Sequence, residues 1–523
     1  MIAGVSHFAR LARAGFVFAR EGVFAIVDPV MLPLPARFAQ RMARLIERPK
    51  TASSEGRLAV ALTELGPTYV KLGQFLATRP DVVGAKVAQG LERLQDRMPP
   101  FAQSAAEATV AAAFDKPLSA VFTSFGPPVA AASIAQVHRA EVMTVTGPRA
   151  VAVKILRPGI EQRFRTDLDS FYFAARRGEA VSSEGRRLRL VEVVDILARS
   201  VRLEMDLRLE AAALSELAEN TKNDKDFRVP AVDWDRTARE VLTLEWIDAT
   251  PLNDRARLEA KGFDLPLLGR SVIQSFLRHA LRDGFFHADM HPGNLFVDDD
   301  GKLVAVDFGI MGRLAPKERR FLAEILYGFI TRDYHRTAEV HFEAGYVPRH
   351  HSVEDFAQAI RAIGEPIHNR TAEDISMAKL LTLLFEVTGL FDMRTRPELL
   401  LLQKTMVVVE GVGRALDPKL DMWKTAEPVV REWIERHLGP AGKIEGAAEG
   451  AGEIGRFIGN VPGLLTRGSN VLDQLDDATR DGLRLAPETV AAIGEAEARR
   501  SRWTAIGIWV IAILLFWAVL KAF

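Results

Sequence analysis

The chain contains no cysteine, which excludes disulfides, thiolate chemistry and cysteine-ligated metal sites. It also has no excess of one charge, because 68 lysines and arginines balance 68 aspartates and glutamates. This balance gives no reason to expect a nucleic-acid partner. With 523 residues, the chain is long enough for about two to four domains.

Long uncharged apolar runs are scarce until residues 503–520, which contain no charged residue. That length is at the lower end for a helix that spans a bilayer. Three arginines precede the run and only Lys521 follows it, so we expect its N-terminal side to be cytoplasmic. The sequence predicts a membrane helix within 501–523, with a buried core helix as the alternative. Residues 438–500 are rich in glycine, alanine and charge, which indicates a tether or amphipathic segment.

The first 50 residues are rich in arginine and phenylalanine and contain no acidic residue before Glu21. Such a pattern is typical of a transit peptide or of an amphipathic helix on a membrane or on the protein itself. We favour the helix because apolar helical patterning continues past Phe24 without an obvious processing site.

Residues 56–96 have helical apolar spacing, interrupted at Gly66-Pro67, where proline can start a new helix. Lys71 and Gln74 then share one helical face, which the residues alone describe as a solvated polar face. Gly73 between them lowers helix stability, so it suggests close approach of another backbone.

Residues 121–157 are typical of strands, with a Gly147-Pro148 turn before an apolar run that ends near Lys154. A protein-kinase strand ends in a similar lysine, which contacts the α- and β-phosphates of ATP. An edge strand with a solvated lysine is the alternative. A long charged connection follows.

One helix is predicted over residues 191–220, where kinases place the glutamate that pairs with this lysine. Periodicity does not choose among Glu204, Asp206 and Glu210. Residues 239–247 then form an apolar strand, equivalent to the kinase strand that leads to the adenine-binding hinge.

Residues 285–313 contain the motifs that indicate a function most specifically. The runs 295–297 and 303–306 flank an Asp/Gly turn and predict a β-hairpin. Asp289 and Asn294 precede this hairpin, and Asp307-Phe308-Gly309 follows it. In phosphoryl transfer, one carboxylate meets the attacking hydroxyl or water, while an amide and a second carboxylate hold Mg²⁺. A polar loop on a generic hairpin is the alternative.

The segment after Gly309 is expected to become helical at once, because residues 317–330 contain no helix breaker. No Ala-Pro-Glu sequence occurs between residues 310 and 485. Since protein kinases dock protein substrates on a long segment at this position, its absence argues against a protein substrate. Residues 353–437 look entirely helical.

Together these residues resemble the UbiB/ADCK family of atypical, protein-kinase-like proteins, over about residues 55–420. A weaker part of the resemblance is Leu416-Asp417-Pro418. The main resemblance rests on Lys71-x-Gly73-Gln74, the alanine-rich segment 130–133, Lys154, Glu204-x-Asp206, His287-x-Asp289 with Asn294, and Asp307-Phe308-Gly309.

The resemblance implies an α+β, two-lobed protein-kinase-like fold. It would have a helical N-terminal extension (1–100), an N-lobe (101–247), a C-lobe (248–437), the tether and the C-terminal transmembrane helix.

The resemblance also implies roles for particular residues. The helix with Lys71 and Gln74 would cover the nucleotide cleft, and Glu204 and Asp206 would meet it. Glu210 would be the partner of Lys154. The remaining expected site residues are Asp289 for catalysis, Asn294 and Asp307 for metal, and Ala130, Ala131, Ala132, Ser133, Glu245 and Ile247 for nucleotide.

The expected activity is that of an ATP-dependent phosphotransferase or ATPase that uses ATP and Mg²⁺ and supports ubiquinone (coenzyme Q) biosynthesis. The expected partners are membrane lipid, a quinone precursor or lipid-like small molecule, and other ubiquinone-biosynthesis proteins. The expected location is the bacterial inner membrane, with the kinase-like domain in the cytoplasm. An aminoglycoside-phosphotransferase-like kinase and a non-catalytic nucleotide-binding scaffold are the alternatives.

Overall fold

The computed structural model describes residues 2–26, 54–77, 98–181, 188–367, 387–393 and 397–439, together with residues 41, 44, 46–48, 83, 87, 90, 91, 94 and 186. Among the helices of these described residues, none is both long and apolar enough to cross a lipid bilayer. The predicted tether, from residue 440 onward, and the predicted span at 503–520 lie outside the described residues.

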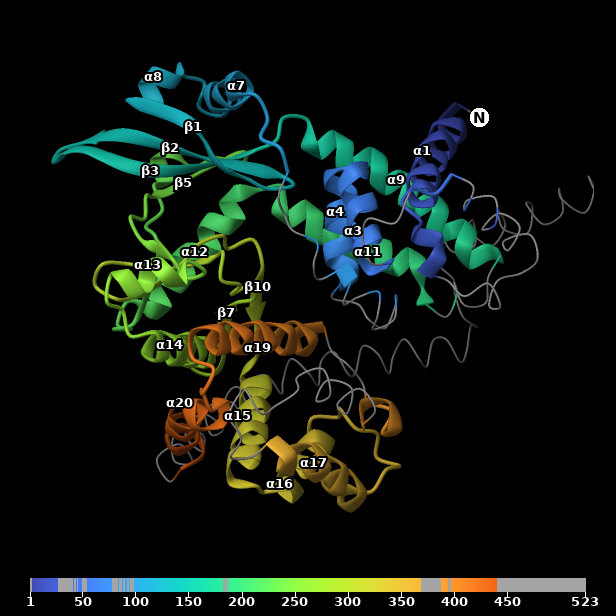
Figure 1. Ribbon diagram of the computed structural model, residues 1–523, viewed down its shortest axis with the longest axis vertical. Helices are drawn as coiled ribbons and strands as arrows, with labels where there is room; N and C mark the ends of the chain where they lie inside the picture. Colours follow the sequence, from blue (N-terminus) through green and yellow to red (C-terminus); the bar gives the residue numbers. More distant parts are fainter. Residues whose placement is uncertain are drawn as a thin grey trace, which may run out of the picture. The chain divides into compact units, whose positions relative to one another are not determined.

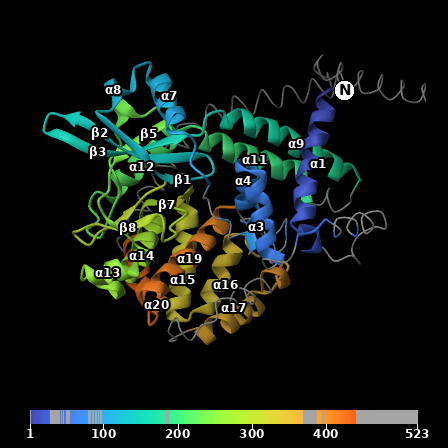
Figure 2. The same ribbon diagram turned by 45° about the horizontal axis from the view of Figure 1, so that its top comes forward.

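The N-terminal region forms a bundle of helices, shown in blue and blue-green in Figure 1. Its members are α1 (Ile2–Arg20), α3 (Ser54–Leu65), α4 (Pro67–Ala77), α9 (Ile160–Val181) and α11 (Leu190–Glu204), with a short 3₁₀ turn, η1 (Val23–Ile26), after α1. These helices pack on one another, and both views show them together (Figures 1 and 2). The charged connection that was expected after Lys154 contains the long helix α9.

Polar and aromatic contacts join the N-terminal helices to α9. The Thr68 hydroxyl donates to Asp167 Oδ2 at 2.7 Å, and Arg10 lies 3.8 Å from the same carboxylate. The rings of Tyr69 and Phe171 meet edge to face with centroids 5.1 Å apart. Helix α1 thus lies on the protein, as one of the two placements expected for an amphipathic N-terminal helix.

Gly66 and Gly73, in the α3–α4 region, are glycines for different structural reasons. Gly66 has a φ of 105°, a left-handed conformation that suits glycine and allows α4 to restart at Pro67. At Gly73, an added Cβ would lie 2.7 Å from a methyl group of Leu62 and 3.2 Å from one of Leu94. The expected close approach at Gly73 is real, but these neighbours are leucine side chains, not the expected backbone.

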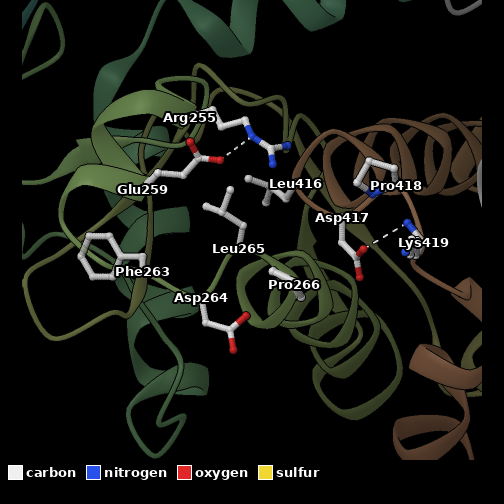
Figure 3. A pocket seen from close by; sticks show the side chains of 10 residues that line it. All are labelled: Arg255, Glu259, Phe263, Asp264, Leu265, Pro266, Leu416, Asp417, Pro418 and Lys419. Carbon is white, nitrogen blue, oxygen red and sulfur yellow. Dashed lines mark hydrogen bonds and ion pairs between the residues drawn. The ribbon is translucent and has the colours of Figure 1, made fainter.

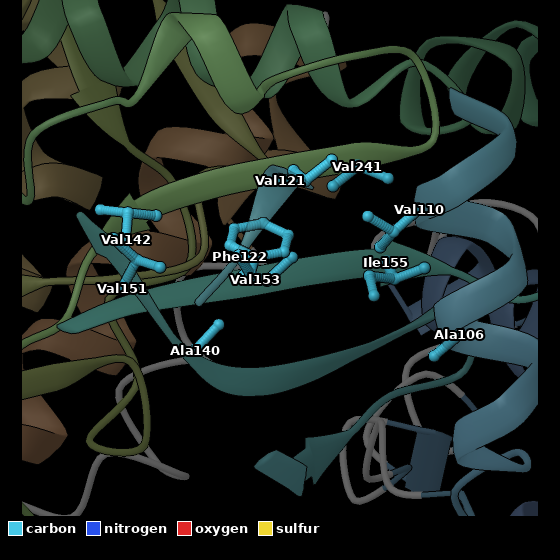
Figure 4. Packing of buried hydrophobic residues seen from close by; sticks show 10 residues of the cluster. All are labelled: Ala106, Val110, Val121, Phe122, Ala140, Val142, Val151, Val153, Ile155 and Val241. Atoms are coloured by element: carbon cyan, nitrogen blue, oxygen red, sulfur yellow. The ribbon is translucent and has the colours of Figure 1, made fainter. Parts of the chain in front are cut away.

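The N-lobe contains an antiparallel sheet in the order β1-β2-β3-β5. Its strands are β1 (Ser124–Ala131), β2 (Ala135–Thr144), β3 (Gly147–Leu156) and β5 (Val241–Glu245). Helices α7 (Gln103–Phe114) and α8 (Leu118–Val121) precede it. Figure 4 shows valines and Ile155 of the strands packed against α7. The alternating buried positions of β3 place Lys154 on the opposite face from this core.

The helix predicted over 191–220 is two helices, α11 and α12 (Leu207–Thr221). The chain leaves helical geometry at Asp206, which has φ −127° and ψ 95° and whose side chain accepts a hydrogen bond from the Arg208 N–H. Asp206 is therefore an N-cap, which periodicity did not reveal because the apolar spacing continues through the break.

The C-lobe begins with α13 (Arg255–Ala260), α14 (Leu265–Arg278) and a π-helical turn, η4 (His279–Asp283). The predicted hairpin is confirmed as β8 (Leu295–Val297) paired with β9 (Leu303–Ala305). Short strands β4 (Phe227–Arg228) and β6 (Thr250–Pro251) flank it, so that sheet has the order β4-β9-β8-β6. A further 3₁₀ turn, η3, covers Trp234–Arg236.

Strand β7 (Phe285–His287) pairs with β10 (Met311–Arg313), so the chain after Gly309 first forms a strand. The expectation of an immediate helix was therefore wrong, because the short strand β10 precedes the first helix. Helices follow, as predicted: α15 (Pro316–Thr331), α16 (Tyr334–Glu343), α17 (Val353–Ile367), α19 (Pro397–Leu416) and α20 (Met422–Leu438). Helix α19 packs along α14 and beside β10, which places it next to the strands that carry the candidate site (Figure 2).

Candidate functional site

Lys154 lies between two carboxylates that come from distant parts of the chain. Its Nζ is 2.8 Å from Glu210 Oε1 and 2.8 Å from Asp307 Oδ1. Strand β3 carries the lysine, the first turn of α12 carries Glu210, and Asp307 follows β9. The Coulomb attraction of both carboxylates, which outweighs burial, raises the pKa of Lys154. The lysine is therefore a fixed positive charge at the junction of the two lobes.

Asp307 combines backbone strain with a lowered pKa. Its φ is 63°, a left-handed conformation that non-glycine residues adopt only where the surroundings impose it. The charge of Lys154 is the main reason that its pKa is lowered, and Lys71 contributes a smaller effect in the same direction. Because 48% of its side chain remains exposed, this ionised carboxylate can also accept a ligand from solvent.

Glu210 links the lysine to the Asp307-Phe308-Gly309 segment. Its Oε1 accepts hydrogen bonds from Lys154 Nζ and from the Phe308 backbone N–H, the latter at 3.2 Å. Burial raises the pKa of Glu210, although the charge of Lys154 opposes this shift. A change at Glu210 would therefore disturb the lysine and the backbone after Asp307 together.

His287 is a buried neutral group that fixes the backbone at Asp289. The Asp289 N–H donates to His287 Nδ1 at 3.0 Å, so Nε2 must carry the proton that is shared with the Val306 carbonyl at 3.2 Å. Burial lowers the pKa of His287, in keeping with this neutral tautomer. The sequence named His287 only as part of a motif and did not reveal this positioning role.

Asp289 and Asn294 face each other across one short loop. The Asn294 side-chain Nδ2 donates to the Asp289 carbonyl at 3.1 Å and to Asp289 Oδ2 at 3.3 Å. These bonds orient the amide so that its oxygen points away from Asp289. The Val306 N–H donates to the Asn294 carbonyl at 2.9 Å, which brings Asn294 beside Asp307 at the open end of the hairpin. Asn294 and Asp307 carry hard oxygen ligands of the kind that suits Mg²⁺, and their predicted role as metal ligands stays a prediction.

The alanine-rich segment 130–133 ends β1 and turns into β2. Ala130 pairs with Val137, and Val137 pairs with Lys154 on β3, so this segment and the lysine lie at the same end of the sheet. The Ala132 N–H donates to the Ala135 carbonyl at 2.8 Å, which closes the turn. Its predicted contact with phosphates stays a prediction.

The helix with Lys71 is joined to α11 by an ion pair, because Lys71 Nζ lies 2.7 Å from Glu204 Oε2. Both side chains are mostly buried, with 12% and 13% of their surfaces exposed. The first description of Lys71 as part of a solvated face was therefore wrong. Asp206 caps α12 and pairs with Arg208, and its predicted contact with the Lys71 helix, like the regulatory role of Gln74, stays a prediction.

Glu245 and Ile247 lie at the end of β5, where the adenine-binding hinge was expected. The Glu245 side chain pairs with Arg228 at 3.1 Å and accepts the Ala231 N–H at 3.2 Å. Arg228 also pairs with Asp298 in the turn of the hairpin. Glu245 therefore ties the two sheets together with its side chain, and the predicted contact of Glu245 and Ile247 with nucleotide stays a prediction.

A pocket of about 500 Å³ lies elsewhere, between the starts of α13 and α14 and the end of α19 (Figure 3). Its lining includes the Leu416-Asp417-Pro418 turn, but none of the described residues predicted to hold nucleotide or metal. Arg255 pairs with Glu259 and donates to the Ala415 carbonyl. These contacts make the pocket a joint between helices, separate from the candidate site.

Comparisons with known proteins show which family this chain resembles. Residues 93–341 match the family described as the ABC1 atypical kinase-like domain, and residues 360–421 match the UbiB helical domain. A "Probable protein kinase UbiB" from Marinobacter nauticus is 41% identical over 84% of this chain and 81% of its own length. One from Pseudomonas putida is 36% identical over 89% of each chain.

A solved structure of Rv3197 with erythromycin, from Mycobacterium tuberculosis, aligns at 25% identity with a TM-score of 0.46, covering 76% of this chain and 97% of that one. The family assignment rests on the two matched domains and on the identity to the bacterial relatives over most of the length of each chain. The chain belongs to the UbiB family of atypical, kinase-like proteins.

Proposed function

We propose that this protein binds ATP with Mg²⁺ and either hydrolyses it or transfers its phosphoryl group to a small lipid-like molecule. We place this activity at the membrane, in support of ubiquinone biosynthesis. The observation that carries the proposal is the placement of Lys154 at 2.8 Å from both Glu210 and Asp307. In protein kinases, a lysine held in this way binds the phosphates of ATP.

The residues present fit the cofactor that the fold implies. Asn294 and Asp307 offer hard oxygen ligands at the open end of the hairpin, and the Asp307 carboxylate lies 2.8 Å from Lys154 Nζ. These two side chains would hold a Mg²⁺ ion, whose positive charge would neutralise the phosphates. Asp289 would accept the proton of the attacking hydroxyl or water, and its backbone is held in place by His287.

The short connection after Asp307 supports a small acceptor. Strand β10 begins at Met311 and α15 at Pro316, so little chain is present where protein kinases hold a protein substrate. The relatives carry the words "protein kinase" in their names, and a protein acceptor therefore remains the competing possibility. The ion pair between Lys71 and Glu204 supports a covered site, in contrast to an aminoglycoside-phosphotransferase-like kinase.

The experiment is an ATP turnover assay on the purified full chain in lipid vesicles, with and without Mg²⁺. We expect Mg²⁺-dependent release of phosphate, and we expect Asp289→Asn to bind nucleotide but turn it over at least about a hundredfold more slowly. Binding without any turnover in the parent would instead support the nucleotide-binding scaffold. Accumulation of a quinone intermediate in a deletion strain, reversed by the parent gene but not by the Asp289→Asn gene, would connect the activity to the pathway.

A further inference from the structure

Residues 98–101, here called the linker segment, pass beside the alanine-rich segment 130–133. The linker segment precedes α7, and thus joins the N-terminal helices to the N-lobe. The Met98 N–H donates to the Ala131 carbonyl at 3.3 Å. The linker segment therefore continues the hydrogen bonding of the sheet beyond the end of β1.

Arg157 holds the two segments together. It follows Lys154 closely in the sequence, just beyond the end of β3. Its guanidinium donates to the Ala132 carbonyl from Nε at 3.1 Å and from an Nη at 2.9 Å, and the same Nη donates to the Pro99 carbonyl at 2.8 Å. The guanidinium also lies over the Phe101 ring, 5.5 Å from its centroid. A planar, permanently charged fork can make all these bonds at once, whereas a lysine cannot.

Gln136 makes a second connection between the same two segments. Its Oε1 accepts the Phe101 N–H at 2.9 Å, and its Nε2 reaches the Phe101 carbonyl at 3.4 Å. Gln136 is 1% exposed and pairs across the strands with Ala131. The Gln136 Nε2 also lies 2.8 Å from His138 Nε2. A buried amide that is bonded at both of its ends is held in place, so its Oε1 fixes the Phe101 backbone.

The alanine-rich segment contains no glycine, so its shape is set by what surrounds it. Two residues connect it to the linker segment: Arg157 donates to the Ala132 carbonyl, and Gln136, which pairs with Ala131 across the strands, bonds Phe101 with its side chain. The Arg157 N–H also donates to the Ile134 carbonyl at 2.8 Å. Movement of the linker segment would therefore be transmitted to the turn between β1 and β2, which lies at the same end of the sheet as Lys154.

We propose that Arg157 and Gln136 are positioning residues that fasten the alanine-rich segment to the linker segment and thereby set the nucleotide preference of the site. This inference rests on the proposed function, because it assigns a regulation to the same nucleotide site. The N-terminal helices would act on nucleotide binding through this covalent connection, in addition to any contact that they make over the cleft.

The test compares the full chain with Arg157→Ala and Arg157→Lys, in lipid vesicles with Mg²⁺. Arg165→Ala is the matched control, because Arg165 pairs with Glu161 and lies near Arg157 in the same surface pocket. The readouts are the dissociation constants of ATP and ADP, by competition with a fluorescent nucleotide, and amide hydrogen exchange. We expect Arg157→Ala to change the ATP-to-ADP affinity ratio about tenfold or more, the size expected for loss of a charge-assisted bond.

In hydrogen exchange, residues 98–101 and 130–136 should lose protection together in Arg157→Ala. Arg157→Lys should fall between the parent and Arg157→Ala in both readouts, and Arg165→Ala should match the parent. If Arg157→Ala fails to fold in a thermal melt, Gln136→Met provides the same comparison, since it keeps the side-chain volume and removes the amide.

The absence of cysteine in the chain allows a rescue experiment. Met98→Cys with Ala131→Cys, placed in the Arg157→Ala background, is chosen to link the two segments by a disulfide, since the Met98 N–H donates to the Ala131 carbonyl. Oxidation should move the ATP-to-ADP ratio back toward that of the parent, and reduction should abolish this recovery. The same protein in its two redox states is its own control.

Two results would overturn the inference. One is an unchanged ATP-to-ADP ratio in Arg157→Ala while exchange shows that both segments have loosened. The other is exchange that increases in only one of the two segments, which would mean that Arg157 does not join them. Failure of the parent to bind any nucleotide would instead contradict the proposed function, and hydrogen exchange would still show whether the two segments are joined.

Discussion

Lys71 Nζ lies 2.7 Å from Glu204 Oε2, and this ion pair joins helix α4 to the last residue of α11. The next residues of the chain lead through the Asp206 cap into α12, which carries Glu210. The charge of Lys71 also contributes to the lowered pKa of Asp307, after the larger effect of Lys154. Lys71 is therefore connected to the candidate site both through the chain and through its charge.

Lys71→Ala tests this connection. Removing one partner of a mostly buried ion pair should lower the free energy of unfolding by about 1–3 kcal/mol and should change nucleotide affinity or permit autophosphorylation without unfolding the domain. Nucleotide titration with thermal melts measures both effects. Arg149→Ala is the control, because it removes an exposed ion pair with Asp233 and should leave nucleotide binding alone. Unchanged ATP and ADP affinities in Lys71→Ala, with no new phosphorylation, would refute a covered site.

Ala131→Gly should alter the balance between ATP and ADP binding. Glycine admits backbone conformations that alanine excludes, so the turn before β2 could close differently near Lys154. Ala150→Gly makes the same substitution near the start of β3, away from the turn, and should preserve the parent's balance. Equal ATP-to-ADP ratios in Ala131→Gly and the parent would show that the alanine-rich segment does not govern the nucleotide.

Deletion of residues 501–523 should release the kinase-like domain from membranes, because the uncharged run 503–520 has the length of a membrane helix. The measurement is flotation of full-length and truncated chains with lipid vesicles. A truncated chain that still floats after a high-salt wash would show that another segment, such as residues 1–50, also binds the membrane.

Stability should fall as the pH is lowered below about 6.5. Burial lowers the pKa of four histidines: His138, His279, His287 and His341. Below the ordinary value of 6.5 the unfolded chain binds protons that the folded chain does not, so the free energy of unfolding decreases with falling pH. Each histidine contributes up to about 1.4 kcal/mol per pH unit.

The measurement for this pH dependence is chemical denaturation at pH 7.5, 6.5 and 5.5. The variant His341→Gln should flatten the slope, because it removes one of the buried histidines whose pKa is lowered. A free energy of unfolding that stays constant or rises toward pH 5.5 would contradict this account.

The sequence predicted best those parts whose geometry follows from short-range rules. The Asp/Gly turn between two apolar runs became the β8–β9 hairpin, and the hairpin by itself brings Asn294 beside Asp307. The strand that ends near Lys154 was also recognised, because β3 alternates buried and partly exposed residues. For these elements, local periodicity and turn chemistry were sufficient.

The contacts between distant segments could not be read from periodicity. Glu204, Asp206 and Glu210 all lie in apolar-patterned sequence, and only the Asp206 cap separates them onto two helices with different partners. The choice of Glu210 as the partner of Lys154 came from the family resemblance. Arg157 gave no signal at all, since its importance depends on the linker segment folding back beside the alanine-rich segment.

The central claim is that Asp307 and its neighbours form a Mg²⁺-dependent nucleotide site, and Asp307→Asn tests it most directly. The substitution keeps the shape of the side chain but removes the charge that pairs with Lys154 and that would serve as a metal ligand. The measurement is ATP turnover by the purified full chain as Mg²⁺ is increased, with circular dichroism to show that the fold is kept. The account predicts that Asp307→Asn loses at least about a hundredfold of the Mg²⁺-dependent rate, and Mg²⁺-dependent turnover equal to that of the parent would contradict it.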